Sequence, residues 1–253
     1  MSTWVFLRGL ARESRHWGNF PATFQAEIAN ANIISPDLPG NGQRNHCKSP
    51  LSVSEMVDCC REELKCRGFS PPFHLLGLSL GAMVAVEWAS AYPCEILPSV
   101  LINTSLRPFS PFYQRLRPRN YPSLLALATL NGNAEKTEHA ILRMTSTRRD
   151  PQSDVIDAWV STRTQHPVTR LNALRQLIAA ARYRAPTRPP DVPLLVLAAA
   201  KDELVNPQCS QQLAHLWRAA HAVHPDAGHD LPLDDGAWVA RQVREWLVAL
   251  PHG

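Results

Sequence analysis

A serine stands between two glycines where an apolar strand turns into an apolar helix. The run Phe73–Leu78 has the length of a buried strand, Ser79-Leu80-Gly81 follows it, and an apolar helical run continues to Ala91. A turn this tight strains its central residue, and glycines at 77 and 81 remove side chains that would clash. An ordinary glycine-rich turn is the alternative, but the flanking strand and helix favour an exposed nucleophilic Ser79 above the positive end of a helix.

Short apolar runs alternate with longer amphipathic runs over most of the chain, a pattern typical of a parallel α/β sheet. The expected strands are residues 3–8, 32–36, 73–78, 99–103, 193–199 and 220–224. The expected helices are residues 19–29, 53–67, 80–91, 207–219 and 235–249. The chain is therefore predicted to build one sheet with helices packed against it.

The alternation stops between Leu106 and Pro190, where strand signals vanish and Pro and Arg become frequent. Amphipathic helices are expected there at 122–131, 134–147, 152–164 and 168–182. A helical block between two strands is more naturally a lid over the sheet edge than a separate domain. We therefore predict a core of residues 1–106 and 191–253 and a helical cap of residues 107–190.

The predicted cap is strongly basic. Residues 107–188 carry 14 Lys or Arg against five Asp or Glu, a local charge of +9 in a chain of +4, and 13 of the 14 are Arg. Arginine binds carboxylate and phosphate through two parallel bonds. A solvated surface is one interpretation, and a cap with some arginines pointing into the cleft toward an anionic substrate or acidic carrier is the other. Trp159, Arg163 and Arg170 are the candidate substrate contacts.

A serine nucleophile needs a base. His229 lies in a short loop after the last expected strand, near the carboxyl edge of the sheet, and Gly228 permits an unusual backbone there. His221 and His224 fall within the last expected strand and His74 within the strand before Ser79, so structural roles are expected for them. No carboxylate or cysteine has ligand-like spacing with these histidines, so no metal site is expected.

The base needs an acid to orient it, and the expected chain order is serine, acid, histidine. Asp202 ends the strand expected at 193–199, in a turn that opens a helix, which brings its carboxylate to the sheet edge that carries Ser79. Glu203, Asp226 and Asp230 are the alternatives. Asp202 is the predicted acid.

Together these residues resemble the α/β-hydrolase superfamily, over essentially the whole chain. The matching segments are Leu7–Leu10, Asp37–Gly42, Gly77–Gly81, Lys201-Asp202 and Gly228-His229. The resemblance implies an α/β-hydrolase fold: a six-stranded, mostly parallel sheet with helices on both faces and a helical cap inserted after the fourth strand. It also implies that the backbone amides of Leu10 and Leu80 form an oxyanion hole.

Within the superfamily the chain looks similar to two small bacterial groups. One is the carboxylesterase of biotin synthesis that cleaves a pimeloyl-carrier methyl ester, and the other is the menaquinone-pathway synthase that eliminates pyruvate with the same triad. The chain departs from the usual pattern by having Arg8-Gly9 in place of His-Gly. Arg8 is therefore a further candidate substrate contact.

We expect a cytoplasmic serine hydrolase that cleaves a small ester or thioester, anionic or carrier-bound, through an acyl-enzyme, without metal or organic cofactor. Six cysteines in 253 residues are too sparse for a disulfide scaffold, and no apolar run approaches the roughly 20 residues of a membrane span. The scattered arginines lack interleaved aromatics, so nucleic acid is not an expected partner. A monomer or weak dimer is expected. The alternatives are a lyase that uses the triad for proton abstraction and elimination on an anionic substrate, and a non-enzymatic binding protein on the same scaffold.

Overall fold

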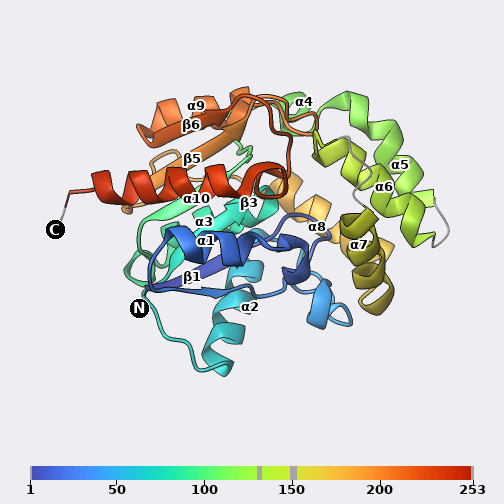
Figure 1. Cartoon of the computed structure of the whole chain (residues 1–253), viewed down its shortest axis with the longest axis horizontal. Coiled ribbons are helices and arrows are strands. Elements are labelled where there is room, and N and C mark those ends of the chain that lie inside the picture. The colour runs from blue at the N-terminus through green and yellow to red at the C-terminus, as the bar shows by residue number, and fades with distance from the viewer. Residues whose placement is uncertain (1, 130–132, 149–152, 252–253) are drawn as a thin grey trace.

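One six-stranded sheet forms the centre of the molecule. The structure, a computed structural model, describes residues 2–129, 133–148 and 153–251. All neighbouring strands run parallel, in the order β2-β1-β3-β4-β5-β6, as Figure 1 shows in part. The strands are β1 (Ser2–Leu7), β2 (Ala31–Ile34), β3 (His74–Leu78), β4 (Ser99–Ile102), β5 (Leu194–Ala199) and β6 (Ala220–His224). The predicted parallel sheet and its six strands are confirmed.

Helices occupy each predicted helical region. They are α1 (Phe20–Glu27), α2 (Val53–Cys66), α3 (Leu80–Ala91), α4 (Phe112–Arg115), α5 (Tyr121–Thr129), α6 (Ala134–Thr145), α7 (Ser153–Gln165), α8 (Arg170–Arg182), α9 (Gln208–Trp217) and α10 (Leu231–Ala249). Positions 130, 131 and 152 of the predicted helices lie outside the described residues.

The predicted start of the last helix at residue 235 was wrong. Helix α10 begins at Leu231, with Pro232 in its first turn, where the missing N–H of proline leaves no helical hydrogen bond unmade. Asp235 has non-helical angles (φ −150°, ψ 76°) and kinks the helix at the residue where the sequence pattern places its start. The short helix α4 was not predicted, because four residues carry no detectable periodicity.

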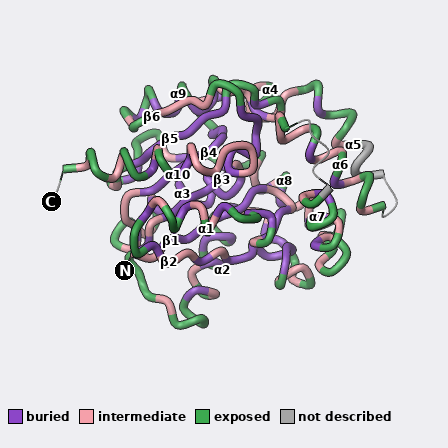
Figure 2. Tube along the Cα trace, viewed as in Figure 1, coloured by how far each residue is buried: buried purple, intermediate pink, exposed green. Residues whose placement is uncertain are grey.

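The inner strands β1, β3, β4 and β5 are mostly buried on both faces, which explains why they are largely apolar. Trp4 and Phe6 of β1 pack into a cluster with α1 and α10, whereas Val5 and Leu7 pack into a second cluster with α2, α3 and α9. Figure 2 shows the inner strands mostly buried, whereas the edge strand β6 and the outer helix surfaces are intermediate or exposed. Polar groups that act on a ligand are therefore expected at the edge where the strands end.

The strand order indicates where along that edge a ligand is expected to bind. The chain moves outward from β1 to β2 and then continues on the other side of β1 with β3, so β1 and β3 are the point where the order reverses. Ligands of open parallel sheets bind outside the carboxyl ends of strands at such a point. The loop that follows β1 and the turn that follows β3 meet there.

The helices between β4 and β5 form the predicted helical insert, and α5, α6 and α7 gather at one end of the molecule (Figure 1). Helices α6 and α7 pack against each other around Leu142, Ile156 and Trp159. Helix α8 lies on the core, where Ala179 joins the cluster beneath α2 and α3. The division into a core and a cap at residues 107 and 190 stays a prediction. Across the described ranges, no helix has the length and apolarity to cross a membrane.

Gly81→Ala should destabilise the fold. A Cβ at Gly81 would lie closer to the Leu7 carbonyl oxygen than real Cβ contacts allow, and that oxygen belongs to the rigid end of β1. Overpacking of this kind costs about 1–3 kcal/mol or more in unfolding free energy. Chemical denaturation measures it. Gly9→Ala is the matched control, because its Cβ would meet its neighbours at an ordinary 3.5 Å. Equal stability losses in the two variants would contradict the close approach of α3 to β1.

Candidate active site

Ser79 occupies a strained turn at the end of β3. Its backbone angles are φ 56° and ψ −113°, which a residue with a side chain rarely adopts and which cost of order 1–3 kcal/mol. The turn is held on both sides: the Ser79 N–H donates to the Ile102 carbonyl at 3.0 Å, and the Ser79 carbonyl accepts from the Ala82 N–H at 3.0 Å. A Cβ at Gly77 would lie 2.5 Å from the Gly81 carbonyl oxygen, so glycine is required there. Ser79 itself is only partly buried.

His229 and Asp202 form a buried pair at the same edge. Nδ1 of His229 lies 2.7 Å from Oδ2 of Asp202, and the two residues are 5% and 1% exposed. The other carboxylate oxygen, Oδ1, accepts from the backbone N–H groups of Leu204 (2.8 Å) and Val205 (2.9 Å). Asp202 is therefore held in place by the turn after β5, and it in turn orients the imidazole.

The loop that carries His229 is held by Asn103, a residue that sequence reasoning did not single out. The Asn103 side-chain amide donates to the carbonyls of His229 (2.8 Å) and Gly228 (3.2 Å), and its oxygen accepts from the Ala199 N–H (2.8 Å). Asn103 is buried and has a positive φ of 46°. The available signal was an asparagine at the end of an apolar strand.

The charge of Asp202 sets the protonation of His229. Burial by itself would lower the pKa of the imidazole, but the charge of Asp202 and its hydrogen bond outweigh burial, so the pKa lies above its ordinary 6.5. Asp230 raises the His229 pKa further and Arg8 lowers it. Because the proton on Nδ1 faces Asp202, the neutral ring keeps Nε2 as its proton acceptor.

The structure distinguishes the four acids that the sequence offered as partners of His229. Asp202 is buried against the imidazole, whereas Glu203 is exposed beside it in sequence. Asp226 is exposed, and Asp230 is buried against an arginine. Only the Asp202 carboxylate makes a hydrogen bond with His229 among the described residues.

The loop after β1 runs alongside Ser79. A Cβ at Gly9 would lie 3.5 Å from the Ser79 Cβ. In the part of the chain that the structure describes, the N–H groups of Leu10 and of Leu80 donate to no protein acceptor. Leu80 is the first residue of α3, whose early N–H groups have no helical partner. The two amides predicted to form an oxyanion hole are thus free to bind a negatively charged oxygen.

Arg8 joins this loop to the loop of the histidine. Its terminal nitrogens donate to both carboxylate oxygens of Asp230, at 2.7 and 3.1 Å, and its guanidinium lies 4.6 Å from the ring centre of Trp17. Both charged residues are buried, and Arg8 outweighs burial in holding the Asp230 pKa below its ordinary value. The Nη1 and Nη2 groups of this candidate substrate contact are thus already paired, and a role toward substrate stays a prediction.

Two of the three candidate contacts on the insert lie together. Trp159 is buried under the guanidinium of Arg12, 3.9 Å from its ring centre, and Arg163 pairs with the fully buried Glu138. Arg12 also pairs with Glu138, at 2.6 Å. Arg170 is exposed at the start of α8. Their roles toward a substrate stay predictions.

Other arginines of the insert hold it to the core. Arg117 donates to the backbone carbonyl of Asp202 at 2.9 Å, and Arg175 donates to that of Ser49. Arg149 lies outside the described residues. Part of the basic excess therefore serves the junction between insert and core, and an orientation toward substrate stays a prediction.

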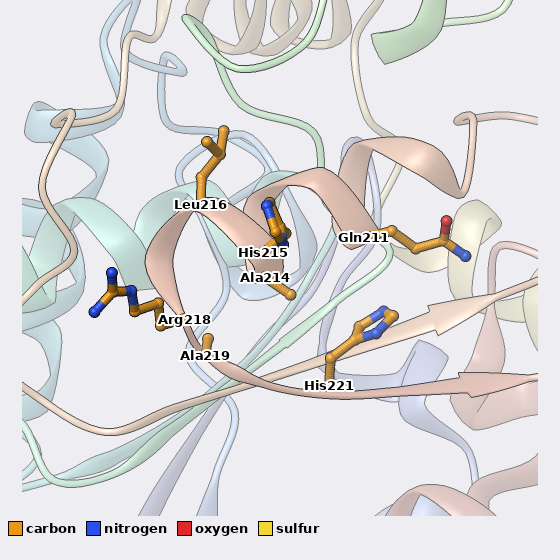
Figure 3. A pocket seen from close by; sticks show the side chains of 7 residues that line it. All are labelled: Gln211, Ala214, His215, Leu216, Arg218, Ala219 and His221. Atoms are coloured by element: carbon orange, nitrogen blue, oxygen red, sulfur yellow. The ribbon is translucent and has the colours of Figure 1, made fainter.

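A groove on the surface lies apart from this edge. A shallow groove between α9 and β6 is lined by residues that include His215, Arg218 and His221, and holds none of the predicted site residues (Figure 3). Within the described ranges, no three His, Cys, Asp or Glu side chains are grouped so that they could hold a metal ion.

Comparisons with known proteins identify the family and the fold. The alpha/beta hydrolase family model matches residues 4–242, nearly the whole chain, so the chain belongs to the alpha/beta hydrolase family. A search of curated protein sequences finds no significant match.

Solved structures share the fold at low sequence identity. A thermophilic esterase from Thermogutta terrifontis is 21% identical, with a TM-score of 0.76 over 98% of this chain and 90% of that one. The enol-lactonase from Burkholderia xenovorans LB400 is 17% identical, with a TM-score of 0.79 over 98% and 91%. A putative lipase from Acinetobacter baumannii AYE is 23% identical, with a TM-score of 0.75 over 98% and 83%.

His229 should titrate with a pKa above 6.5 in the wild type and below 6.5 in Asp202→Asn. Removing the carboxylate charge leaves burial as the largest influence, and burial disfavours the imidazolium. NMR titration of the ring protons of His229 gives both values. Glu203→Gln is the matched control, because its exposed carboxylate is not bonded to His229, and it should leave the pKa unchanged. An unchanged pKa in Asp202→Asn would contradict the electrostatic coupling of the pair.

Proposed function

We propose that this chain is a serine hydrolase that cleaves small esters or thioesters through an acyl-enzyme on Ser79. The observation that carries the proposal is the buried Asp202–His229 pair, placed at the same sheet edge as the strained turn of Ser79. A serine hydroxyl is a poor nucleophile at its ordinary pKa and requires a neighbouring base that is itself oriented by an acid. Each of the three residue types is present at the edge where the strand order places a ligand.

In the first half of the reaction the Ser79 hydroxyl attacks the carbonyl carbon. The proton of the hydroxyl passes to Nε2 of His229, while Nδ1 keeps its proton toward Asp202. The imidazolium then protonates the departing alcohol or thiol. In the second half, His229 takes a proton from water, which attacks the acyl-enzyme, and the imidazolium returns that proton to the Ser79 oxygen as the acid leaves. The Asp202 charge favours the imidazolium, in agreement with the direction of the His229 pKa.

The amides of Leu10 and Leu80 supply the stabilisation of the tetrahedral intermediate. Neither donates to an acceptor among the described residues, and Gly9 brings the first loop to within van der Waals distance of Ser79. Losing one such donor costs about 2.7–4 kcal/mol in transition-state stabilisation where it has been measured. Backbone donors do not depend on which residue precedes Gly9, so the replacement of His by Arg8 leaves the hole in place.

The two bacterial groups that the chain resembles differ in the reaction that they catalyse. The biotin-pathway carboxylesterases hydrolyse an ester, whereas the menaquinone-pathway synthases use the same three residues to abstract a proton and eliminate pyruvate. Hydrolysis is the reaction we propose, and the two unpaired amides and the Asp202–His229 pair support it, since they suit an oxyanion and proton transfer to a leaving group. An elimination enzyme would show Ser79-dependent activity without forming an acyl-enzyme.

Asp202→Asn should lower kcat for p-nitrophenyl ester hydrolysis by about 10⁴-fold, because an amide favours the wrong imidazole tautomer. Ser79→Ala should abolish turnover with the fold intact. Glu203→Gln, one residue away and exposed, should retain wild-type kcat. Steady-state kinetics on p-nitrophenyl esters from acetate to palmitate, together with acyl-CoA thioesters, measures all three variants. A crippled Glu203→Gln beside a nearly normal Asp202→Asn would identify Glu203 as the acid.

A further inference from the structure

The segment from Arg8 to Trp17 contains several buried N–H donors that have no acceptor. They are Nε of Arg8, Nη2 of Arg12, Nε2 of His16 and Nε1 of Trp17, each without a hydrogen-bond partner in the structure. A buried donor without an acceptor is rare in folded proteins and often marks a site for water or a ligand. Four of them within ten residues of the oxyanion loop therefore require an explanation.

His16 contributes a donor because of its tautomer. The backbone N–H of Glu13 donates to Nδ1 of His16 at 3.0 Å, while the Glu13 carbonyl oxygen is farther from the same nitrogen, at 3.3 Å. Burial, and then the charges of Arg12 and Arg8, hold the His16 pKa well below 6.5, so the ring is neutral. A neutral ring that accepts at Nδ1 carries its proton on Nε2. That N–H is the one without an acceptor.

The charges of the same region do not balance. Arg8, Arg12 and Arg163 share two buried carboxylates, since Asp230 pairs with Arg8 and Glu138 accepts from both Arg12 and Arg163. Among the described contacts, three positive charges thus face two negative ones, and the Arg163 side chain, 22% exposed, is the one that also reaches solvent. Burial accordingly outweighs Glu138 and lowers the pKa of Arg12. A buried charge that is only partly compensated is unfavourable, so a bound anion would stabilise this cluster.

The other acids of this region are engaged elsewhere. Glu13 pairs with Arg15 and with His166, and Asp202 lies against His229. Asp37 accepts from the backbone N–H groups of residues 14 and 43. None of these carboxylates pairs with Arg12 among the described contacts, which favours a ligand carboxylate as a further partner for its guanidinium.

Arg12 is the centre of the region. Its guanidinium stacks on Trp159 at 3.9 Å, and the His16 ring meets the same indole edge-on at 5.8 Å. The side chain of Arg12 is 8% exposed, and the oxyanion-hole residue Leu10 precedes it by two positions. A group bound here would therefore belong to the substrate whose carbonyl meets Ser79.

We propose that Arg12, with His16 as a second donor, forms a subsite for a carboxylate at the far end of the substrate's acyl chain. This inference rests on the proposed function and deepens it: the substrate is a half-ester or half-thioester of a dicarboxylic acid. The subsite combines a guanidinium, which binds carboxylate through parallel N–H bonds, with a neutral imidazole N–H. Trp159 supplies the apolar surface that stacks on the guanidinium.

Calorimetric binding of the free dicarboxylates from succinate to suberate, with the matching diamides as neutral analogues, tests the subsite without turnover. At least one dicarboxylate should bind the wild-type protein about ten-fold or more tighter than its diamide. Equal affinity of acid and diamide at every chain length, or no binding of any of them, would overturn the proposal. This comparison uses the unmodified protein and does not depend on any variant folding.

Two variants separate a carboxylate subsite from a structural ion pair. Arg12→Met should weaken dicarboxylate binding about ten-fold or more, whereas Glu138→Gln removes the competing carboxylate and should retain or increase it. Arg143→Met, an exposed arginine on the same helix as Glu138, is the matched control and should bind as the wild type does. A purely structural role predicts equal weakening in Arg12→Met and Glu138→Gln, since each breaks the same pair, and that result would overturn the proposal.

Kinetics with methyl half-esters and the corresponding ester-amides then separates this proposal from the hydrolase proposal. The wild type should prefer the half-ester in kcat/KM, and Arg12→Met should lose that preference while it retains turnover of the neutral ester. Ser79-dependent hydrolysis of neutral esters without any preference for the half-ester would overturn the subsite alone. Tight dicarboxylate binding in a protein that hydrolyses no ester would support the subsite and overturn the hydrolase.

Discussion

The contact between the start of α3 and the end of β1 is the constraint on which the site depends. Gly81 lies so close to the Leu7 carbonyl oxygen that a Cβ at this position would overlap it. This approach closes the turn of Ser79 so tightly that the serine adopts a positive φ of 56°. It also brings the loop after β1 alongside the serine, so the two loops at the reversal of strand order form one surface. Both sheet faces are covered by helices, and this edge is where the chemistry is placed.

A second set of interactions ties the remaining loops to that edge. Asn103 at the end of β4 holds the backbone of the His229 loop, and Arg8 at the end of β1 holds Asp230, the next residue. In this chain the arginine adds a buried ion pair 222 residues apart in sequence, so the loops of the proposed oxyanion hole and base are linked directly. Removing one partner of such a pair by mutation is strongly destabilising, because the other charge then remains buried without a counter-charge.

Much of this arrangement could be predicted from local patterns. The strands, most helices and the turn of Ser79 are encoded in runs of five to fifteen residues, and chain order was enough to place Asp202 and His229 at one edge. The contacts of Arg8 and Arg12 could not be predicted in this way. Their partners, Asp230 and Glu138, are far away in sequence, and a single chain gives no signal that a particular arginine is buried rather than solvated. The start of α10 was missed for a different reason, since the kink at Asp235 interrupts the helical pattern after one turn.

The same limit applies to the basic insert. Its excess of arginine indicated an anionic partner or a solvated surface, and the structure adds a third use, since Arg117 and Arg175 hold the insert to core carbonyls. The buried cluster with more arginines than carboxylates is centred on Arg12, which lies in a core loop and contacts the insert residues Glu138 and Trp159. Counting charges along the sequence cannot locate such a cluster, because its excess of positive charge depends on which side chains are buried together.

The central claim is that the edge formed by β1 and β3 activates one serine as a nucleophile. Labelling with a fluorophosphonate, followed by peptide mass spectrometry, tests this claim without knowledge of the substrate. We expect a single adduct, on Ser79, that forms far more slowly in His229→Ala and is absent in Ser79→Ala. An adduct on another serine, or a labelling rate that does not depend on His229, would contradict it.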